Sequence, residues 1–154
     1  MFVKEYNGDS IPFRECYGWT QRRIDIPSPT RGRRWEPILP LIGGLTGFLI
    51  TADLTYTGKV KGPDPTEMGG LVFDLGLGAK KGLQVANLVS GPKPTREQVV
   101  ASFVHMHDFL HAELTEDECR SIRFDSVMLE HTLCKFQRLT REMSRCGFLI
   151  DQQI

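Results

Sequence analysis

Apolar and polar residues alternate most regularly from Phe48 to Thr57. The apolar positions on one side of this run are Phe48, Ile50, Ala52, Leu54 and Tyr56. Such alternation is typical of a β-strand with one buried face. A second alternating run spans residues 71–77, and a third apolar run, 83–89, follows the glycine-containing segment 78–82. The last two runs predict a hairpin, and the three together predict an antiparallel β-meander.

Proline and glycine favour the same interpretation. All nine prolines and fourteen of the fifteen glycines precede Thr95. Proline lacks a backbone donor and glycine adds backbone entropy, so a region rich in both is predicted to form strands and turns. We expect edge strands at residues 2–6 and 11–19, and an irregular basic arm at residues 20–42.

Beyond Pro94 the chain has the signals of helices. Thr95 with Gln98, and Thr115 with Glu118, have the spacing of capping boxes. A longer helix is expected from about Asp125 to a C-terminal glycine at Gly147. Its predicted apolar face consists of Met128, Leu129, Thr132, Phe136, Leu139 and Met143. Residues 148–150 are expected to dock after it as a short apolar tail.

These patterns predict an α+β fold, in which an antiparallel β-meander in roughly the first 90 residues packs against two or three C-terminal α-helices. The length of 154 residues fits a single domain, 1–154, with a β region at 1–94 and a helical region at 95–154. In architecture alone, this arrangement is similar to small viral matrix or accessory proteins. The resemblance implies a role in assembly.

Charge and hydropathy exclude several classes of protein. The chain has 19 basic and 19 acidic residues, so no net charge draws it as a whole to nucleic acid or anionic lipid. The longest apolar stretch, residues 38–50, is interrupted by Pro40 and three glycines and is shorter than the roughly 20 residues that span a bilayer. No transmembrane segment or secretory signal is therefore expected. The four cysteines are widely spaced, which favours reduced thiols and a cytoplasmic, intracellular location.

The arm carries the candidate partner-binding residues. Residues 21–35 contain five arginines and a single acid, Asp25. Guanidinium groups suit phosphate and carboxylate, and tryptophan rings offer stacking surfaces. The candidates are Trp19, Arg22, Arg23, Arg31, Arg33, Arg34 and Trp35. The arm also holds Ile38, Leu39, Leu41 and Ile42, which need burial somewhere, so we expect a protein partner or a second copy of the chain.

Three of the four histidines lie between His105 and His111. His107 and His111 are spaced i, i+4, as a pair of ligands to a divalent metal would be, and Asp108 or Glu113 could add an oxygen. The segment matches no known metal-binding signature, and on a helical wheel His105 and Asp108 turn away from His107. Packing of the histidines against the rest of the fold is the alternative interpretation.

The sequence contains no recognisable catalytic motif. It therefore predicts a non-catalytic interaction or assembly protein, which uses the basic arm and the sheet surface and has no resident cofactor. One alternative is binding of nucleic acid or an anionic membrane surface through the arginines. The other is a metal-dependent enzyme centred on His107 and His111.

Overall fold

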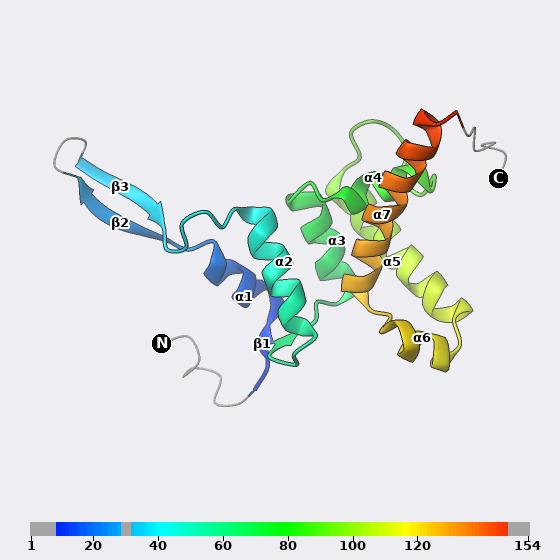
Figure 1. Ribbon diagram of the computed structural model, residues 1–154, viewed down its shortest axis with the longest axis horizontal. Coiled ribbons are helices and arrows are strands. Elements are labelled where there is room, and N and C mark those ends of the chain that lie inside the picture. The colour runs from blue at the N-terminus through cyan, green and yellow to red at the C-terminus, as the bar shows by residue number, and fades with distance from the viewer. Residues whose placement is uncertain (1–8, 29–31, 148–154) are drawn as a thin grey trace. The chain divides into compact units, whose positions relative to one another are not determined.

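The structure is a computed structural model that describes residues 9–28 and 32–147 (Figure 1). The chain divides into two compact units, Met1–Pro63 (unit 1) and Asp64–Ile154 (unit 2). The expected strand at residues 2–6 and the expected tail at 148–150 lie outside the described residues. That the whole chain forms one domain stays a prediction.

Unit 1 contains two helices and two small sheets among its described residues. Its elements are β1 (Ile11–Pro12), α1 (Phe13–Thr20), β2 (Arg23–Ser28), β3 (Gly32–Pro37), α2 (Gly44–Thr55) and β4 (Val60–Lys61). β1 pairs with β4 in parallel, and β2 pairs with β3 as an antiparallel hairpin. α1 packs on α2, with the rings of Phe13 and Phe48 5.8 Å apart. Gly47 lets α2 approach the side chain of Thr20 closely.

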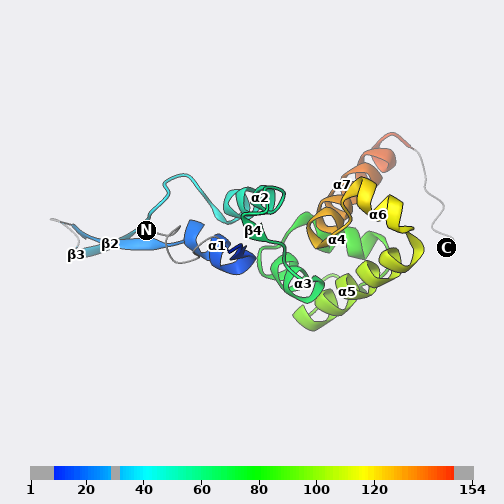
Figure 2. The same cartoon turned by 90° about the horizontal axis from the view of Figure 1, so that it is seen from below.

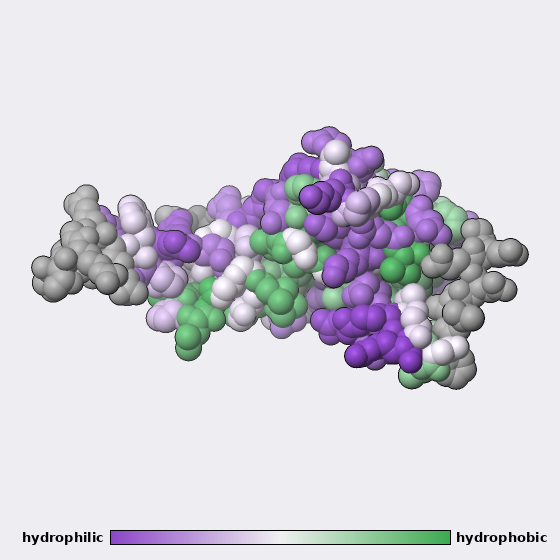
Figure 3. All heavy atoms as spheres, turned by 90° about the horizontal axis from the view of Figure 1, so that it is seen from above, coloured by the Kyte–Doolittle hydropathy of each residue, from purple (hydrophilic) through white to green (hydrophobic). Residues whose placement is uncertain are grey.

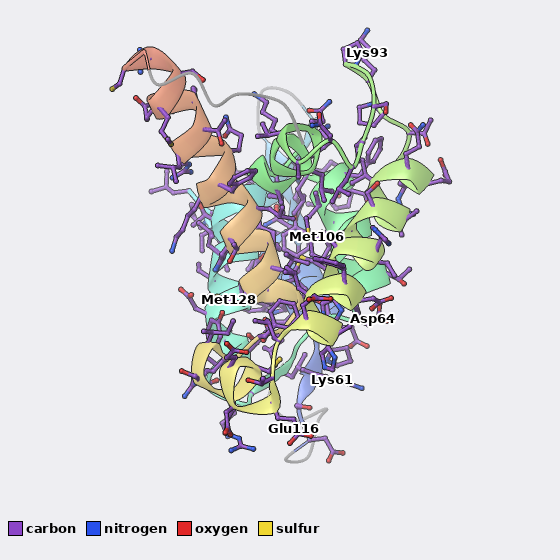
Figure 4. The ribbon with its side chains drawn as sticks, turned by 90° about the vertical axis from the view of Figure 1, so that its right-hand side faces the viewer. Lys61, Asp64, Lys93, Met106, Glu116 and Met128 are labelled. Carbon is purple, nitrogen blue, oxygen red and sulfur yellow. The ribbon has the colours of Figure 1, made fainter. Side chains whose placement is uncertain are left out.

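Unit 2 is helical throughout its described elements. They are α3 (Pro65–Asp74), α4 (Gly78–Val85), α5 (Arg96–Glu113), α6 (Glu116–Ile122) and α7 (Ser126–Arg145). α3 lies beside α5 and α4 beside α7 (Figure 2). α5 runs between the loop that carries Lys93 and the start of α6 at Glu116 (Figure 4). The largest fully buried side chains of this unit are Met68, Val72, Leu83, Val99, Phe103, Val127 and Leu129.

The predicted β-meander is wrong. Residues 48–55 belong to α2, residues 71–74 end α3 and residues 83–85 end α4. The predicted edge strand at 11–19 is also wrong, because only Ile11–Pro12 is extended and α1 begins at Phe13. The chain is therefore mostly helical, and its strands are confined to two-stranded sheets in the described residues. The similarity to viral matrix proteins depended on the sheet and loses its basis.

Glycine explains the error. Gly69, Gly78 and Gly82 are not turn residues but helical residues at which another helix comes close. A Cβ atom on Gly69 would lie 2.9 Å from the Cα atom of Val100 in α5, and one on Gly82 would overlap the carbonyl group of Leu133 in α7. Glycine permits such close backbone approach because it has no side chain. These residues therefore allow α3 to lie close to α5, and α4 close to α7.

The predicted helix ends beyond Pro94 are confirmed. Both capping boxes are present, with Thr95 and Thr115 each accepting a hydrogen bond from the backbone amide three residues on. The side chain of Asp125 caps α7 in the same way. Gly147 has φ +77°, and its amide donates to the carbonyl oxygen of Ser144 at 3.2 Å. That bond is one of the two that define a Schellman C-cap.

Candidate interaction surface

The expected irregular arm is in fact the β2–β3 hairpin with its connections. Arg22 precedes β2, Arg23 opens it, and both are exposed. Arg33, Arg34 and Trp35 belong to β3, and the side chain of Trp35 is 63% exposed. Trp19 lies apart from the hairpin in the last turn of α1, and Arg31 lies outside the described residues. A two-stranded hairpin has two open edges, which is why Pro27 and Pro37 can be part of it.

The register divides the candidate residues between the two faces of the hairpin. Asp25 pairs with Trp35 and Pro27 pairs with Arg33, so Trp35 and Arg33 share one face. Arg34 pairs with Ile26 on the opposite face. The hairpin also includes Glu36, opposite Ile24, which offsets part of the basic charge.

The histidine cluster packs around an aromatic ring. The ring of His107 stacks on Phe124 with centroids 5.2 Å apart, and His111 lies 6.2 Å from His107 and 6.4 Å from Phe124. Asp108 contacts the Nδ1 atom of His107 at 3.3 Å, and His105 is exposed. In the part of the chain that the structure describes, no three His, Cys, Asp or Glu side chains are grouped to hold a metal ion. The alternative interpretation of packing histidines fits this geometry better than a metal centre does.

One buried carboxyl group has a strongly shifted pKa. Burial in unit 2 raises the pKa of Glu130 to about 7, against the smaller opposing effect of Arg138. The carboxylate lies 3.7 Å from the ring of His131, the next residue of α7. A buried carboxyl group with a raised pKa makes stability depend on pH.

Leu41 has the most unusual position in unit 1. The amide of Ile42 donates to the carbonyl oxygen of Leu39 at 3.3 Å, which closes a turn with Pro40 at its second position. Leu41, at the third position, has φ +72° and is 99% exposed. This is the geometry of a type II turn, whose third position normally requires glycine. A leucine here strains the backbone and displays its side chain in solvent.

The outward face of α2 continues the apolar surface next to this turn. Leu45 is 60% exposed, and Leu49, one turn further on, and Ile50 are also exposed. The opposite face buries Phe48, Thr51 and Ala52. The only charged residue of α2 is Asp53. Figure 3 shows apolar surface over the base of the hairpin and over α2. We call Leu41, Leu45, Leu49 and Ile50 the α2 surface.

Leu41 was among the residues expected to need burial, but the rest of the α2 surface was not predicted from the sequence. Residues 48–57 were predicted to form a strand with Phe48 and Ile50 on its buried side, so Leu49 was placed on the opposite side and Leu45 lay outside the strand. The signal that could have found them is a helix-length segment that is apolar on all sides. Such a helix is either fully buried or an interaction surface.

All four cysteines are free thiols, and that of Cys16 is buried. Among the described residues, no helix combines the length and the apolar character needed to cross a membrane. No protein-family model, curated protein or solved structure matches the chain. Inference of function therefore starts from the side chains described above.

Proposed function

We propose that this chain is a non-catalytic interaction or assembly protein that binds a protein partner, or a second copy of itself, through the α2 surface and the adjoining hairpin. The observation that carries the proposal is Leu41. Its backbone is strained and its side chain is 99% exposed. Strain of this kind persists at sites where it serves binding.

The chemistry of the α2 surface indicates what it binds. Three leucines and an isoleucine are displayed with Asp53 as the only charge of the helix. Apolar surface of this density on a folded protein marks a protein contact more often than a nucleic-acid contact, which requires clustered cations. Trp35, exposed on the hairpin, adds the type of side chain that most often dominates binding energy in interfaces. The expected partner presents an uncharged groove or helix face.

A photo-crosslinking experiment tests this proposal. Benzoylphenylalanine is placed at position 41 of the full chain, both in purified protein and in extract of the cells that produce it. Position 87 is the control, since Asn87 is exposed and also has a positive φ, +58°. We expect a discrete protein adduct from position 41, several-fold stronger than from position 87. A second substitution in the same chain, Leu45→Asp, should lower the yield of this adduct.

The mass of the adduct distinguishes a second copy from another protein. Adducts of equal yield from both positions, or an adduct that Leu45→Asp leaves unchanged, would contradict the proposal. An adduct removed by nuclease would also contradict it and would favour nucleic-acid binding by the arginines.

A further inference from the structure

A second apolar surface follows the C-terminal half of α7. Thr132, Phe136, Leu139 and Met143 are spaced four, three and four residues apart, which is the spacing of the a and d positions of a heptad. Phe136 is 41% exposed, Leu139 is 59% exposed, and Met143 is partly exposed. We call these four residues the α7 seam.

The described part of unit 2 leaves much of the seam exposed. The residues that α7 buries are Ser126, Val127, Leu129, Glu130 and Leu133, all in its N-terminal half. α4 contacts that half, where Gly78 and Gly82 approach Cys134 and Leu133. The C-terminal half extends beyond α4 (Figures 1 and 4). The sequence predicted that the residues of the seam would be buried. Their exposure in the structure therefore needs a physical explanation.

Charges beside the seam indicate what covers it. With Phe136 and Met143 at a and Leu139 at d, the flanking g positions hold Lys135 and Glu142, one cation and one anion. Charges at e and g positions determine the orientation of paired helices. In an antiparallel pair of identical helices g faces g, so Lys135 of one copy meets Glu142 of the other, twice. In a parallel pair Lys135 would face Thr140 and gain nothing.

The same axis brings the apolar residues into register. A twofold axis midway between Phe136 and Leu139 places Phe136 of each copy against Leu139 of the other, and Met143 against Thr132. The remaining cations, Arg138, Arg141 and Arg145, occupy c and f positions on the far side of the helix, so they do not meet across the contact. A twofold contact of this kind uses one surface patch twice.

We propose that residues 132–143 of α7 form an antiparallel pair with the same segment of a second copy of the chain. The contact covers about three turns of each helix. The surface area that it buries is therefore smaller than the ~1,600 Å² of a standard protein–protein interface. The dimer is therefore weak and in rapid exchange, with a dissociation constant on the order of 10 to 100 µM. It does not depend on the α2 surface, so either proposal can fail without the other.

Sedimentation equilibrium of the full chain, from about 10 to 500 µM, measures the association. Leu139→Lys puts a charge at the centre of the seam and is expected to weaken the dimer by at least about tenfold. Ser144→Lys adds the same charge at a b position outside the seam and should have little effect. A Leu41→Asn variant should dimerise like the wild type, which separates this contact from the α2 surface.

Charge reversal at two exposed positions tests the antiparallel orientation. Glu142 also pairs with Arg141 and Arg145 of its own helix, at 3.2 and 3.4 Å, and the Lys135→Glu variant leaves these pairs intact. Lys135→Glu or Glu142→Lys alone places like charges opposite each other twice and should weaken the dimer roughly fivefold. The double variant restores both pairs and should regain wild-type affinity. The two positions are seven residues apart, about 10 Å along the helix, so they cannot compensate each other within one copy.

Three results would overturn the proposal. One is a monomeric wild type at the highest concentration. Another is a double reversal as weak as the single reversals. The third is a full chain that is monomeric while a chain ending at Gly147 dimerises, because residues 148–150 would then occupy the seam in place of a second copy.

Discussion

Leu41 shows how a single residue can be unfavourable for the isolated protein. A left-handed conformation costs a leucine about 1–2 kcal/mol relative to ordinary backbone, whereas glycine adopts it freely. The turn that contains Leu41 has Pro40 ahead of it, which fixes the position that requires the positive φ. Because the Leu41 side chain is almost fully exposed, burial of apolar surface does not offset this cost in the folded state.

We therefore expect Leu41→Gly to leave the free energy of unfolding unchanged or to raise it by up to about 1 kcal/mol, even though it removes a large side chain. Urea denaturation measures this. The control is Ile38→Gly, at an exposed position without positive φ, which should lower stability by about 0.5–1 kcal/mol. A clear loss of stability in Leu41→Gly would indicate that Leu41 supports the fold rather than an interface.

Glu130 determines a dependence of stability on pH. Its pKa is raised from 4.5 to about 7 in the folded chain, because burial disfavours the carboxylate. Between these values the folded state binds the proton and the unfolded state does not, so stability falls as pH rises through this window. The loss is complete above pH 7 and amounts to at most about 3 kcal/mol.

Glu130→Gln removes this titration. The variant should be about as stable as the wild type near pH 5 and more stable at pH 8, by up to about 3 kcal/mol. Urea denaturation of both proteins at several pH values between 5 and 8 gives the difference, in which other titrating groups cancel. Parallel pH profiles for the two proteins would rule out the raised pKa.

The features that the sequence predicted correctly are local ones. Thr95, Thr115 and Asp125 cap helices by bonding to amides three residues away, so their spacing alone identifies them. The positive φ of Leu41 could not be predicted, because nothing in the pair Pro40-Leu41 marks a turn that normally takes glycine. The candidate arginines follow one another closely in the sequence, but the strand positions of Arg23, Arg33 and Arg34 depend on the register of β2 and β3.

At the scale of elements, glycine was the misleading residue. A glycine in a loop and a glycine at a helix crossing look alike in sequence, and only the neighbouring backbone distinguishes them. Segment 78–82 was interpreted as a hairpin turn, yet it begins α4 and faces α7 with Gly78 and Gly82, one turn apart. The alternating pattern in α2 was misleading for a related reason. This helix is apolar on nearly all sides, so every second residue is apolar without any strand being present.

Gly82→Ala tests the role of glycine at the α4–α7 crossing. The added methyl group would overlap backbone atoms of Leu133, which cannot rotate away, so we expect a loss of about 2–3 kcal/mol or more in the free energy of unfolding. The matched control is Gly18→Ala in α1, where a Cβ meets nothing within 4 Å. That change should stabilise the protein by about 0.5–1 kcal/mol, since alanine favours a helix. Thermal denaturation of the two variants should shift in opposite directions.

At the scale of the molecule, the two units differ in how much apolar surface they bury. Among the described residues, five apolar side chains are buried in unit 1, and twelve in unit 2. Small cores give marginal stability, and segments that rely on them open more often. The α2 surface therefore belongs to the unit with less of its own stabilisation, as is common for surfaces that bind partners.

This difference predicts uneven hydrogen exchange in the full chain. Amides of α2 should exchange through openings that cost less free energy than those of α5 and the N-terminal half of α7, by about 2 kcal/mol or more. Hydrogen exchange followed by mass spectrometry at neutral pH measures both regions in one sample. In the Gly82→Ala variant, exchange in α4 and α7 should be faster than in the wild type. If instead all helices of the wild type share one opening free energy, the chain unfolds as one cooperative domain, as its length and composition predict. In that case a weakly stabilised unit would not explain the exposure of Leu41 and Leu45. The strained backbone at Leu41 would then be the remaining support for the proposal that the α2 surface binds a partner.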